Sequence, residues 1–508
     1  MADEGQGRES LEAVRLEKLR RIEALGVDPW GRRFDGHRAI ADVRALQAPS
    51  SGDPEPGPKV RVAGRIVLKR TQGKIVFLKL RDWTEDIQIF VGKNQVGEAG
   101  WALASELDLG DLLGVDGTLG HTKTGELTVF AGSLTFLGKS LLPPPEKWHG
   151  LTDVEQRSRQ RYVDLFSNPE SLRTFLGRSK VLAAFRRVLA DRGFVEVETP
   201  TMQSIAGGAA ARPFVTHHNA LDLDLFLRIA LELHLKRLLV GGMERVFELG
   251  RVYRNEGISR RHNPEFTMLE AYQAYSDYHG MMDLTEALIV GAIEAIDGNL
   301  RRTYHVPGAV EGESEAIEID FNPPWPRRSY ADLFREHVGI DPHDDAAVRE
   351  RARTLGIEAG QGVDRDVVVS EVFEEVVEPR LKGPVFVVDY PSAICPLTKR
   401  KADDPGVAER FELFVLGVEL ANAYTELNDP LLQEDLLRRQ LAGQRAEDSM
   451  ATMDDDFVRA LKHAMPPAGG LGVGIDRLCM FLLDRQNIRD VILFPLLRPE
   501  GGERAEGR

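Results

Sequence analysis

Residues 244–275 read ERVFELGRVYRNEGISRRHNPEFTMLEAYQAY, and this stretch decides the fold. It contains two runs of alternating apolar side chains on either side of a charged loop, which predicts two neighbouring strands of one sheet. On the second strand, the alternation places four side chains on one face: Phe266, Met268, Glu270 and Tyr272. We therefore expect one face of this sheet to combine aromatic and apolar groups with a carboxylate.

Glu270 needs a cation, because a carboxylate among apolar neighbours is costly to desolvate unless it is paired. The preceding strand and loop supply four candidates: Arg254, Arg260, Arg261 and His262. Two interpretations stay open from this pattern. Glu270 forms a structural ion pair with one of these groups, or it faces a positively charged ligand.

A second strand-like run, ELFVLGVELANAYTEL (412–427), repeats the theme. Alternation aligns four polar side chains on one parity: Glu412, Asn422, Tyr424 and Glu426. Glu419 falls on the other parity, so a bulge or a twist is needed before it can join them. A wet edge strand is the alternative explanation for so many polar residues.

The third segment is GGLGVGIDRLCMFLLD (469–484), where four glycines precede a helix that begins close to Arg477. Glycines allow close approach of the backbone to a ligand or to another chain segment. The spacing is not that of a dinucleotide-binding fingerprint, and no phosphate-binding P-loop sequence occurs. Taken alone, these glycines are as compatible with tight packing as with ligand binding.

The N-terminal part predicts a separate small β-barrel. A charged helix (8–25) and a linker rich in proline and glycine (48–58) come before several short alternating runs between residues 60 and 137.

Eight basic residues and no acidic residue lie between Lys59 and Arg81, and we call them the basic strip. They are Lys59, Arg61, Arg65, Lys69, Arg70, Lys74, Lys79 and Arg81. Phe77 lies within this strip, and Gln88 follows on the next strand. An aromatic ring among cations fits single-stranded nucleic acid; a solvated barrel face, with Phe77 in the core, is the alternative.

The composition limits the function classes. The chain has 508 residues, a formal net charge of −15 and only two cysteines, Cys395 and Cys479. A disulfide framework or a cysteine-rich zinc site is excluded by this count, and a polyanion must bind a local patch. No signal peptide or membrane-spanning run is evident, so we expect a cytoplasmic protein without a membrane partner.

These segments resemble the class II aminoacyl-tRNA synthetases and, within them, the lysyl-tRNA synthetases. The helix followed by GFVEVETPTM (193–202) resembles the first motif of the class, 244–275 the second and 469–484 with IRDVILFPLLRP the third. The segments GGAAARPFVTHHNALDLDLFLRIALELHLKRLLVGG and ELANAYTELNDP resemble the lysine-specific pattern. The resemblance implies an α+β fold: an OB-type β-barrel and a catalytic domain whose antiparallel sheet is flanked by helices.

The implied domains are an N-terminal helical extension and linker (1–58), an anticodon-binding OB-fold (59–140), a linker (141–160), a catalytic domain (161–500) and a disordered tail (501–508). The catalytic domain carries an insertion at approximately 300–382. The resemblance also implies a homodimer, whose interface includes the helix near 175–192 and the strand at 193–202.

For the ATP site, the resemblance implies that Arg254 contacts the α-phosphate, that His262 and Arg477 hold the outer phosphates, and that Phe266 stacks on adenine. Glu256 and Asn263 complete the ATP-binding set. Glu412 and Glu419 are expected to bind Mg²⁺, about three ions per active site.

For the amino acid, the resemblance implies that Glu232 and the Gly207–Gly208 backbone meet the α-amino group, and that Asn422 orients the substrate. Glu270 and Glu426, helped by Tyr272 and Tyr424, are expected to face the ε-ammonium group of L-lysine, a cation that the protein itself does not supply. On the barrel, Arg70, Phe77 and Gln88 are expected to contact the anticodon of tRNA(Lys).

Three departures and two rival functions remain. The family usually has A-P-E-L-Y-L-K where this chain has ALELHLK, with Leu231 and His234, and a tyrosine where this chain has Ser158. An aspartyl or asparaginyl synthetase would present a positive group to the substrate side chain. A non-enzymatic RNA-binding paralogue would have lost its phosphate-binding residues.

Overall fold

A computed structural model describes residues 2–52, 55–145, 151–205, 207–208, 211–308, 314–360, 362–443 and 453–498. The chain forms two compact units, Met1–Leu172 and Arg173–Arg508. The expected tail at 501–508 lies outside the described residues, as do parts of both linkers. No helix among the described residues is both long enough and apolar enough to cross a bilayer.

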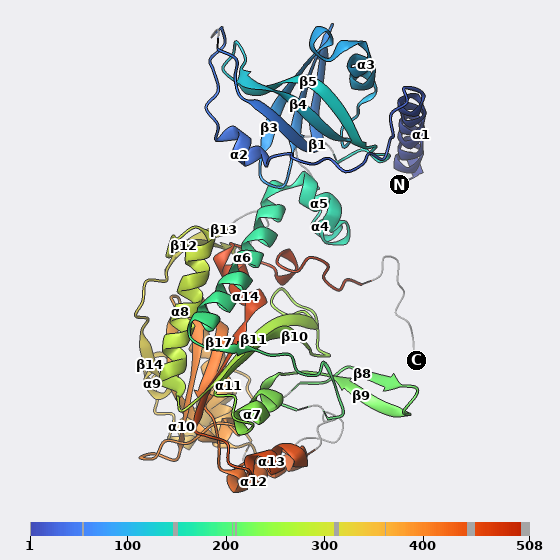
Figure 1. Cartoon of the computed structure of the whole chain (residues 1–508). Coiled ribbons are helices and arrows are strands. Elements are labelled where there is room, and N and C mark those ends of the chain that lie inside the picture. The colour runs from blue at the N-terminus through green and yellow to red at the C-terminus, as the bar shows by residue number, and fades with distance from the viewer. Residues whose placement is uncertain are drawn as a thin grey trace. The chain divides into compact units, whose positions relative to one another are not determined.

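The first unit is built on a closed five-stranded barrel with the order β1-β2-β3-β5-β4 (Figure 1). Its strands are β1 (Lys59–Gln72), β2 (Ile75–Arg81), β3 (Asp86–Gly92), β4 (Leu112–His121) and β5 (Leu127–Gly138). Its helices are α1 (Ala2–Ala24), α2 (Ile40–Arg44), α3 (Lys93–Glu106), α4 (Val154–Arg159) and α5 (Arg161–Ser167). Alternate strand residues such as Val76, Leu78, Ile87 and Ile89 fill the barrel core, which confirms the predicted barrel.

The second unit is organised around an eight-stranded sheet with the order β14-β15-β16-β17-β18-β11-β10-β6. The central strands are antiparallel, and only the outer pairs β14–β15 and β10–β6 are parallel. The strands are β6 (Val195–Glu196), β10 (Arg245–Tyr253), β11 (Glu265–Ala274), β14 (Arg327–Ser329), β15 (Val385–Pro391), β16 (Val407–Val415), β17 (Val418–Thr425) and β18 (Ala468–Gly474). This is the antiparallel catalytic sheet that the sequence predicted.

The two faces of the sheet are covered differently. Helices α6 (Pro169–Asp191), α8 (Tyr278–Ile296) and α14 (Ile475–Leu482) share the main hydrophobic core with one face, to which β11 contributes Leu269 and Ala271. The opposite face carries Met268 and Tyr272 and packs in part against α7 (Glu232–Val240) and α13 (Asp455–Leu461). The alternation along residues 266–272 is therefore as predicted, and its polar face is the one left for a site.

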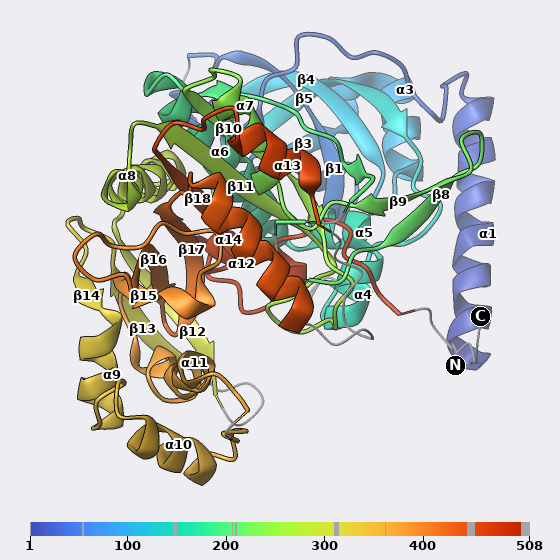
Figure 2. The same cartoon turned by 90° about the horizontal axis from the view of Figure 1, so that it is seen from below.

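The segment expected as an insertion forms a hairpin and a helical layer. The hairpin is β12 (Arg301–Pro307) with β13 (Ser314–Asp320). The layer consists of α9 (Tyr330–Val338), α10 (Asp345–Thr354), α11 (Arg365–Val376) and the 3-10 turn η1 (Glu378–Arg380), which lie beside β14 and β15 (Figure 2). A small sheet of β7 (Met202–Gln203), β8 (Val215–His218) and β9 (Leu223–Leu227), the helix α12 (Pro430–Gly443) and two further turns, η2 (Ser392–Ile394) and η3 (Ile488–Asp490), complete the unit.

Candidate active site

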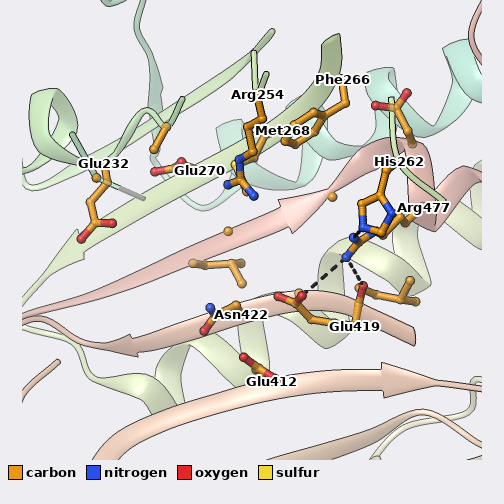
Figure 3. A pocket seen from close by; sticks show the side chains of 18 of the residues that line it. Glu232, Arg254, His262, Phe266, Met268, Glu270, Glu412, Glu419, Asn422 and Arg477 are labelled. Carbon is orange, nitrogen blue, oxygen red and sulfur yellow. Dashed lines mark hydrogen bonds and ion pairs between the residues drawn. The ribbon is translucent and has the colours of Figure 1, made fainter. Parts of the chain in front are cut away.

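A cavity of about 400 Å³ lies on the polar face of the large sheet (Figure 3). It is lined by strands β11, β16, β17 and β18, by the loop after β10 and by the start of α14. Of the residues expected to contact ATP, Mg²⁺ or lysine, those that line it are Gly208, Glu232, Arg254, Glu256, His262, Asn263, Phe266, Glu270, Tyr272, Glu412, Glu419, Asn422, Tyr424 and Arg477. Glu426 is absent from this lining, since its side chain is fully buried behind the wall.

A β-bulge brings Glu419 to the same side as Glu412. The pairing of β16 with β17 runs from Glu412↔Asn422 to Leu413↔Ala421 and then shifts to Phe414↔Glu419. Leu420 is skipped in this pairing, so the residues of β17 before it point to the opposite face from the one that simple alternation predicts. The bulge that the sequence required for Glu419 is therefore present, and both carboxylates line the cavity.

Arg477 is positioned by an ion pair beneath the helix that carries it. The neighbouring Asp476 accepts hydrogen bonds from Arg178 on α6 (2.6 Å) and from the backbone amide of Thr267 on β11 (2.6 Å). Arg178 also donates to the Thr267 hydroxyl at 2.9 Å. These bonds fix the start of α14 against β11, so Arg477 projects into the cavity opposite Phe266.

One end of the cavity is cationic. Arg477 donates to Nε2 of His262 at 2.9 Å and lies 3.5 Å from the Glu419 carboxylate. Burial, and then the charge of Arg477, lower the pKa of His262, so its imidazole is neutral at neutral pH. Arg254 lies 5.3 Å from the centroid of the Phe266 ring, and burial lowers its pKa. This end is suited to anionic groups.

The nearby Asn263 has an unmet hydrogen-bonding atom. Its Nδ2 donates to the carbonyl of Glu265 at 2.6 Å. Its buried Oδ1 has no hydrogen-bond partner among the residues that the structure describes. A buried acceptor of this kind is costly unless a ligand or a water donates to it.

Glu412 and Glu419 form an acidic wall between the two ends. Glu412 accepts from Tyr390 at 2.9 Å and is paired with Arg410, a cavity residue that sequence reasoning missed. Arg410 also donates to Asn422 at 3.2 Å. Burial raises the pKa of Glu412, and Glu419 raises it further.

Further carboxylates lie near the acidic wall. Burial raises the pKa of Glu378 to about 8, with further contributions from Glu412, Glu374 and Glu419. No group of three or more acidic, histidine or cysteine side chains within the described ranges has the arrangement of a metal site. Two carboxylates are nevertheless the protein contribution typical of Mg²⁺ sites that are completed by substrate phosphates.

The other end of the cavity is anionic, and Glu270 is its centre. The Glu270 carboxylate accepts from the backbone amide of Leu231 at 3.0 Å and from the hydroxyl of Tyr272 at 2.9 Å. Burial, and then the charge of Glu232, raise its pKa to about 7. Across the described residues, Glu270 forms no ion pair with an arginine, so the structural ion pair is the wrong one of the two interpretations.

Glu426 does have a cation within the protein, contrary to expectation. Lys236 lies between Glu426 and Glu232, 2.5 Å from the Glu232 carboxylate and in an ion pair with Glu426. The expectation that the protein supplies no cation is therefore wrong for Glu426. Sequence reasoning missed Lys236, although its spacing of four residues from Glu232 on a helix was a signal of pairing.

A glycine makes room beside Glu426. A Cβ at Gly470 would lie 1.9 Å from Oε1 of Glu426 and 2.6 Å from the ring of Tyr272. Any larger residue would displace one of these groups. Oε1 of Glu426 is buried and has no hydrogen-bond partner in the described part of the chain, so this oxygen is an unmet acceptor next to the cavity.

The three departures from the family pattern have defined places. Leu231 is fully buried, and its backbone amide holds Glu270; a proline, which lacks the N–H group, could not donate this bond. His234 is half-buried, 3.4 Å from Gln203, and burial lowers its pKa. Ser158 is buried in α4 and donates to the carbonyl of Val154.

On the barrel, Arg70, Phe77 and Gln88 lie on the outer surface. Phe77 alternates with the core residues Val76 and Leu78 and is only partly buried, so the interpretation of Phe77 as barrel core is wrong. Its ring meets that of Phe90 on the neighbouring strand, at 5.4 Å between centroids. Arg70 pairs with Phe77 across β1 and β2. Gln88, on β3, donates to Thr128 at 2.9 Å.

Much of the basic strip has partners within the protein. Arg61 forms an ion pair with Asp116 (2.7 Å) and Arg81 with Asp86 (2.6 Å). Lys69 donates to main-chain carbonyls at the end of α3, including that of Leu107 at 2.6 Å. Part of the positive charge of the strip is therefore neutralised within the protein. The partners come from β3, β4 and α3, which lie outside the segment that was counted.

Each of the two units matches a known family. Residues 153–498 match the family model described as tRNA synthetases class II (D, K and N), and residues 60–137 match that of the OB-fold nucleic acid binding domain. The chain is 48% identical to a lysine–tRNA ligase of Moorella thermoacetica, over 96% of this chain and 98% of the relative.

Two other curated relatives carry the same name. The lysine–tRNA ligase of Pelotomaculum thermopropionicum is 50% identical, over 98% of this chain and 97% of the relative. That of Thermosynechococcus vestitus is 49% identical, over 99% and 100%. With a family model that covers most of the chain and relatives matched along their whole length, the chain belongs to the class II tRNA synthetases and, among these, to the lysine–tRNA ligase family.

Proposed function

We propose that this chain activates L-lysine with ATP and transfers the lysyl group to tRNA(Lys), releasing AMP and diphosphate. The observation that carries the proposal is the polarity of one cavity. Arg254 and Arg477 lie at one end, where a triphosphate fits. Glu270 and the unmet oxygen of Glu426 mark the other end, where a side-chain ammonium group fits.

The first step requires positioning rather than a protein nucleophile. A carboxylate oxygen of lysine attacks the α-phosphorus of ATP, and the bond to the departing diphosphate breaks. Arg254 lies on the side of the cationic end that faces Glu270 and neutralises charge on the reacting groups, while Arg477 and His262 hold the outer phosphates (Figure 3). Phe266 offers a flat surface for adenine, and the Oδ1 of Asn263 offers an acceptor beside it. Fixed cations of this kind stabilise charge as it develops.

The second step transfers the acyl group. A ribose hydroxyl at the 3′ end of the tRNA attacks the lysyl carbonyl carbon, and AMP leaves with the bonding electrons. Glu232 and Glu270 keep the amino acid in place through both steps, since each contacts an ammonium group that does not react. Asn422 lies between these carboxylates and the acidic wall, where it orients the substrate.

Glu412 and Glu419 would hold Mg²⁺. The fit rests on their common face and on the oxygen donors that Mg²⁺ prefers. Burial raises the pKa of Glu412 and Glu378, and the neighbouring carboxylates add to both shifts. When bound, Mg²⁺ would neutralise the phosphate oxygens of ATP. Arg410 keeps Glu412 aligned toward the cavity.

The barrel binds the anticodon loop in this proposal. Phe77 and Phe90 form an aromatic surface beside the exposed Arg70, and unpaired bases stack on such surfaces. Arg70 is the expected phosphate contact, so Arg70→Ala should weaken all tRNAs alike and flatten the salt dependence. Lys69 does not share this role, because it caps α3.

We further propose that the chain is a homodimer and works in the cytoplasm. The apolar stripe of α6, including Val181 and Phe185, packs in the protein's own core and gives no support for a second copy. The support comes instead from the short edge strand β6, where Val195 is 51% exposed, and from Met202, which is 56% exposed.

The proposed compartment is supported by the cysteines. Cys395 and Cys479 are free rather than paired, which fits a reducing compartment.

Pyrophosphate exchange measured with each standard amino acid in turn tests the proposed function. Lysine alone should support exchange. Exchange with aspartate or asparagine would instead support the rival synthetases. That outcome conflicts with the site, because Lys236, the cation behind the anionic end of the cavity, is already held by Glu232 and Glu426. Binding of tRNA(Lys) without exchange would support an RNA-binding paralogue.

A further inference from the structure

We propose that Lys236 is a positioning residue that sets the charge of the lysine pocket, so that two net negative charges face the two ammonium groups of the substrate. This inference rests on the proposed roles of Glu232, Glu270 and Glu426. It adds a residue to which neither the sequence pattern nor the comparisons gave a role.

Lys236 lies behind the cavity wall and acts only through its partners. It is fully buried on α7, one turn after Glu232, and its Nζ is 2.5 Å from Oε1 of Glu232. The same Nζ is paired with Oε2 of Glu426 and lies 5.5 Å from the centroid of the Tyr424 ring. The other oxygen of Glu426, Oε1, has no hydrogen-bond partner among the described residues. It lies so close to Gly470 that a Cβ at this position would clash with it.

The charges of this end of the cavity balance those of the substrate. Once all three are ionised, the carboxylates of Glu232, Glu270 and Glu426 against the one ammonium group of Lys236 leave two negative charges. Free lysine brings an α-ammonium and an ε-ammonium group, and its carboxylate lies toward Arg254. Without Lys236, three buried carboxylates would face two cations, and one carboxyl would keep its proton.

The titratable groups packed around this pair set the charge of the pocket before lysine binds. Glu232 and Lys236 come from α7, Glu426 follows β17, Glu270 and Tyr272 come from β11, and Tyr424 comes from β17. Burial and the nearby carboxylates raise the pKa of both tyrosines well above the usual value, so they stay neutral. The pKa of Lys236 is raised to about 12, so it stays charged. Burial raises the pKa of Glu426 to about 8 even though Lys236 opposes this shift.

Lys236→Met tests the inference, because methionine is close in length and carries no charge. The KM for lysine in pyrophosphate exchange should rise at least about tenfold at neutral pH, since an opposite charge at this distance shifts a carboxyl pKa by about 1–3 units. The KM should then fall steeply as the pH is raised through the pKa of Glu426. The KM for ATP should stay near the wild-type value, and Lys236→Arg, which keeps the charge, should recover most of the affinity for lysine.

The barrel unit offers a matched control. Lys139 is also fully buried and is paired with two carboxylates, those of Asp108 (2.7 Å) and Asp111 (2.9 Å). Lys139→Met should lower the melting temperature without changing the KM for lysine or its pH profile. If a folded Lys236→Met variant behaves like Lys139→Met, Lys236 has only a structural role and the inference is overturned.

A double variant covers the case in which Lys236→Met does not fold. Lys236→Met/Glu426→Gln removes one carboxylate together with the ammonium group, so only Glu232 loses its partner and the chain should fold more readily than Lys236→Met. Its KM for lysine should be high, and the pH dependence that comes from Glu426 should be absent, so that only the titration of Glu270, whose pKa burial raises to about 7, remains. A KM that still falls steeply as the pH rises above the range in which Glu270 titrates would contradict the inference. Equal lysine activation by wild type and Glu270→Gln would instead remove the proposed lysine site itself, which separates the two failures.

Discussion

Replacing Glu270 by glutamine should separate recognition of the lysine side chain from the chemistry of ATP. Glutamine has the same size as glutamate, and its carbonyl oxygen can still accept a hydrogen bond from the backbone amide of Leu231. Its amide nitrogen cannot accept a hydrogen bond from the hydroxyl of Tyr272, and the negative charge is lost. The ε-ammonium group would then be desolvated beside a neutral amide.

The size of the effect follows from burial. Glu270 is 5% exposed, so solvent does little to screen its interaction with a bound cation. Removing one partner of a buried charge pair costs about 3–5 kcal/mol. A loss of about 3 kcal/mol corresponds to roughly a 10²-fold fall in kcat/KM for lysine. Because burial raises the pKa of Glu270 to about 7, an assay near pH 8 keeps most of the wild-type carboxyl ionised.

The assay is pyrophosphate exchange as a function of lysine and of ATP, with Glu248→Gln as control. Glu248 lies opposite Glu270 on β10 and is equally buried, but it is paired with Arg228 and accepts from Thr199 at 2.7 Å. Its loss should lower stability and leave the KM for lysine unchanged. An unchanged kcat/KM for lysine in Glu270→Gln, or an equal loss in both variants, would refute the reasoning.

Three further predictions concern Glu270, Leu231 and Phe77. The pKa of Glu270 in the folded chain is raised from 4.5 to about 7, so its contribution to the free energy of unfolding is complete below pH 4.5 and is lost as the pH rises toward 7. In denaturant titrations over this range, the free energy of unfolding of the wild type should fall by about 3 kcal/mol relative to that of Glu270→Gln. Leu231→Pro removes the amide that stabilises the Glu270 carboxylate, so the KM for lysine at pH 7 should rise by an amount corresponding to about 1.5–3 kcal/mol; Leu231→Ala keeps the amide, and an equal rise there would disprove the role of the N–H group. Phe77→Ala should cost about 1–3 kcal/mol of tRNA affinity in a binding titration, with a nearly unchanged melting temperature and lysine activation; a large fall in melting temperature at constant affinity would contradict the surface role.

The sequence alone determined the local patterns. Period-2 alternation placed Phe266, Met268, Glu270 and Tyr272 on one face of a strand, and the structure has them on the cavity face. The same parity argument showed that Glu419 required a bulge, which is present. Motif resemblance gave the α+β fold and the barrel, and both are confirmed. These inferences worked because a pleated strand fixes the direction of each side chain within a few residues.

Only the tertiary structure decided which charges meet. Lys236 joins Glu232, four residues away on the same helix, to Glu426, which comes from a distant strand. Lys69 and Arg61 belong to a segment without acidic residues, yet one caps α3 and the other is paired with Asp116. The physical reason is that the strength of an ion pair depends on the distance between its two charges and on how deeply both are buried. Folding brings together residues that are far apart in sequence, and their separation in sequence predicts neither that distance nor that burial.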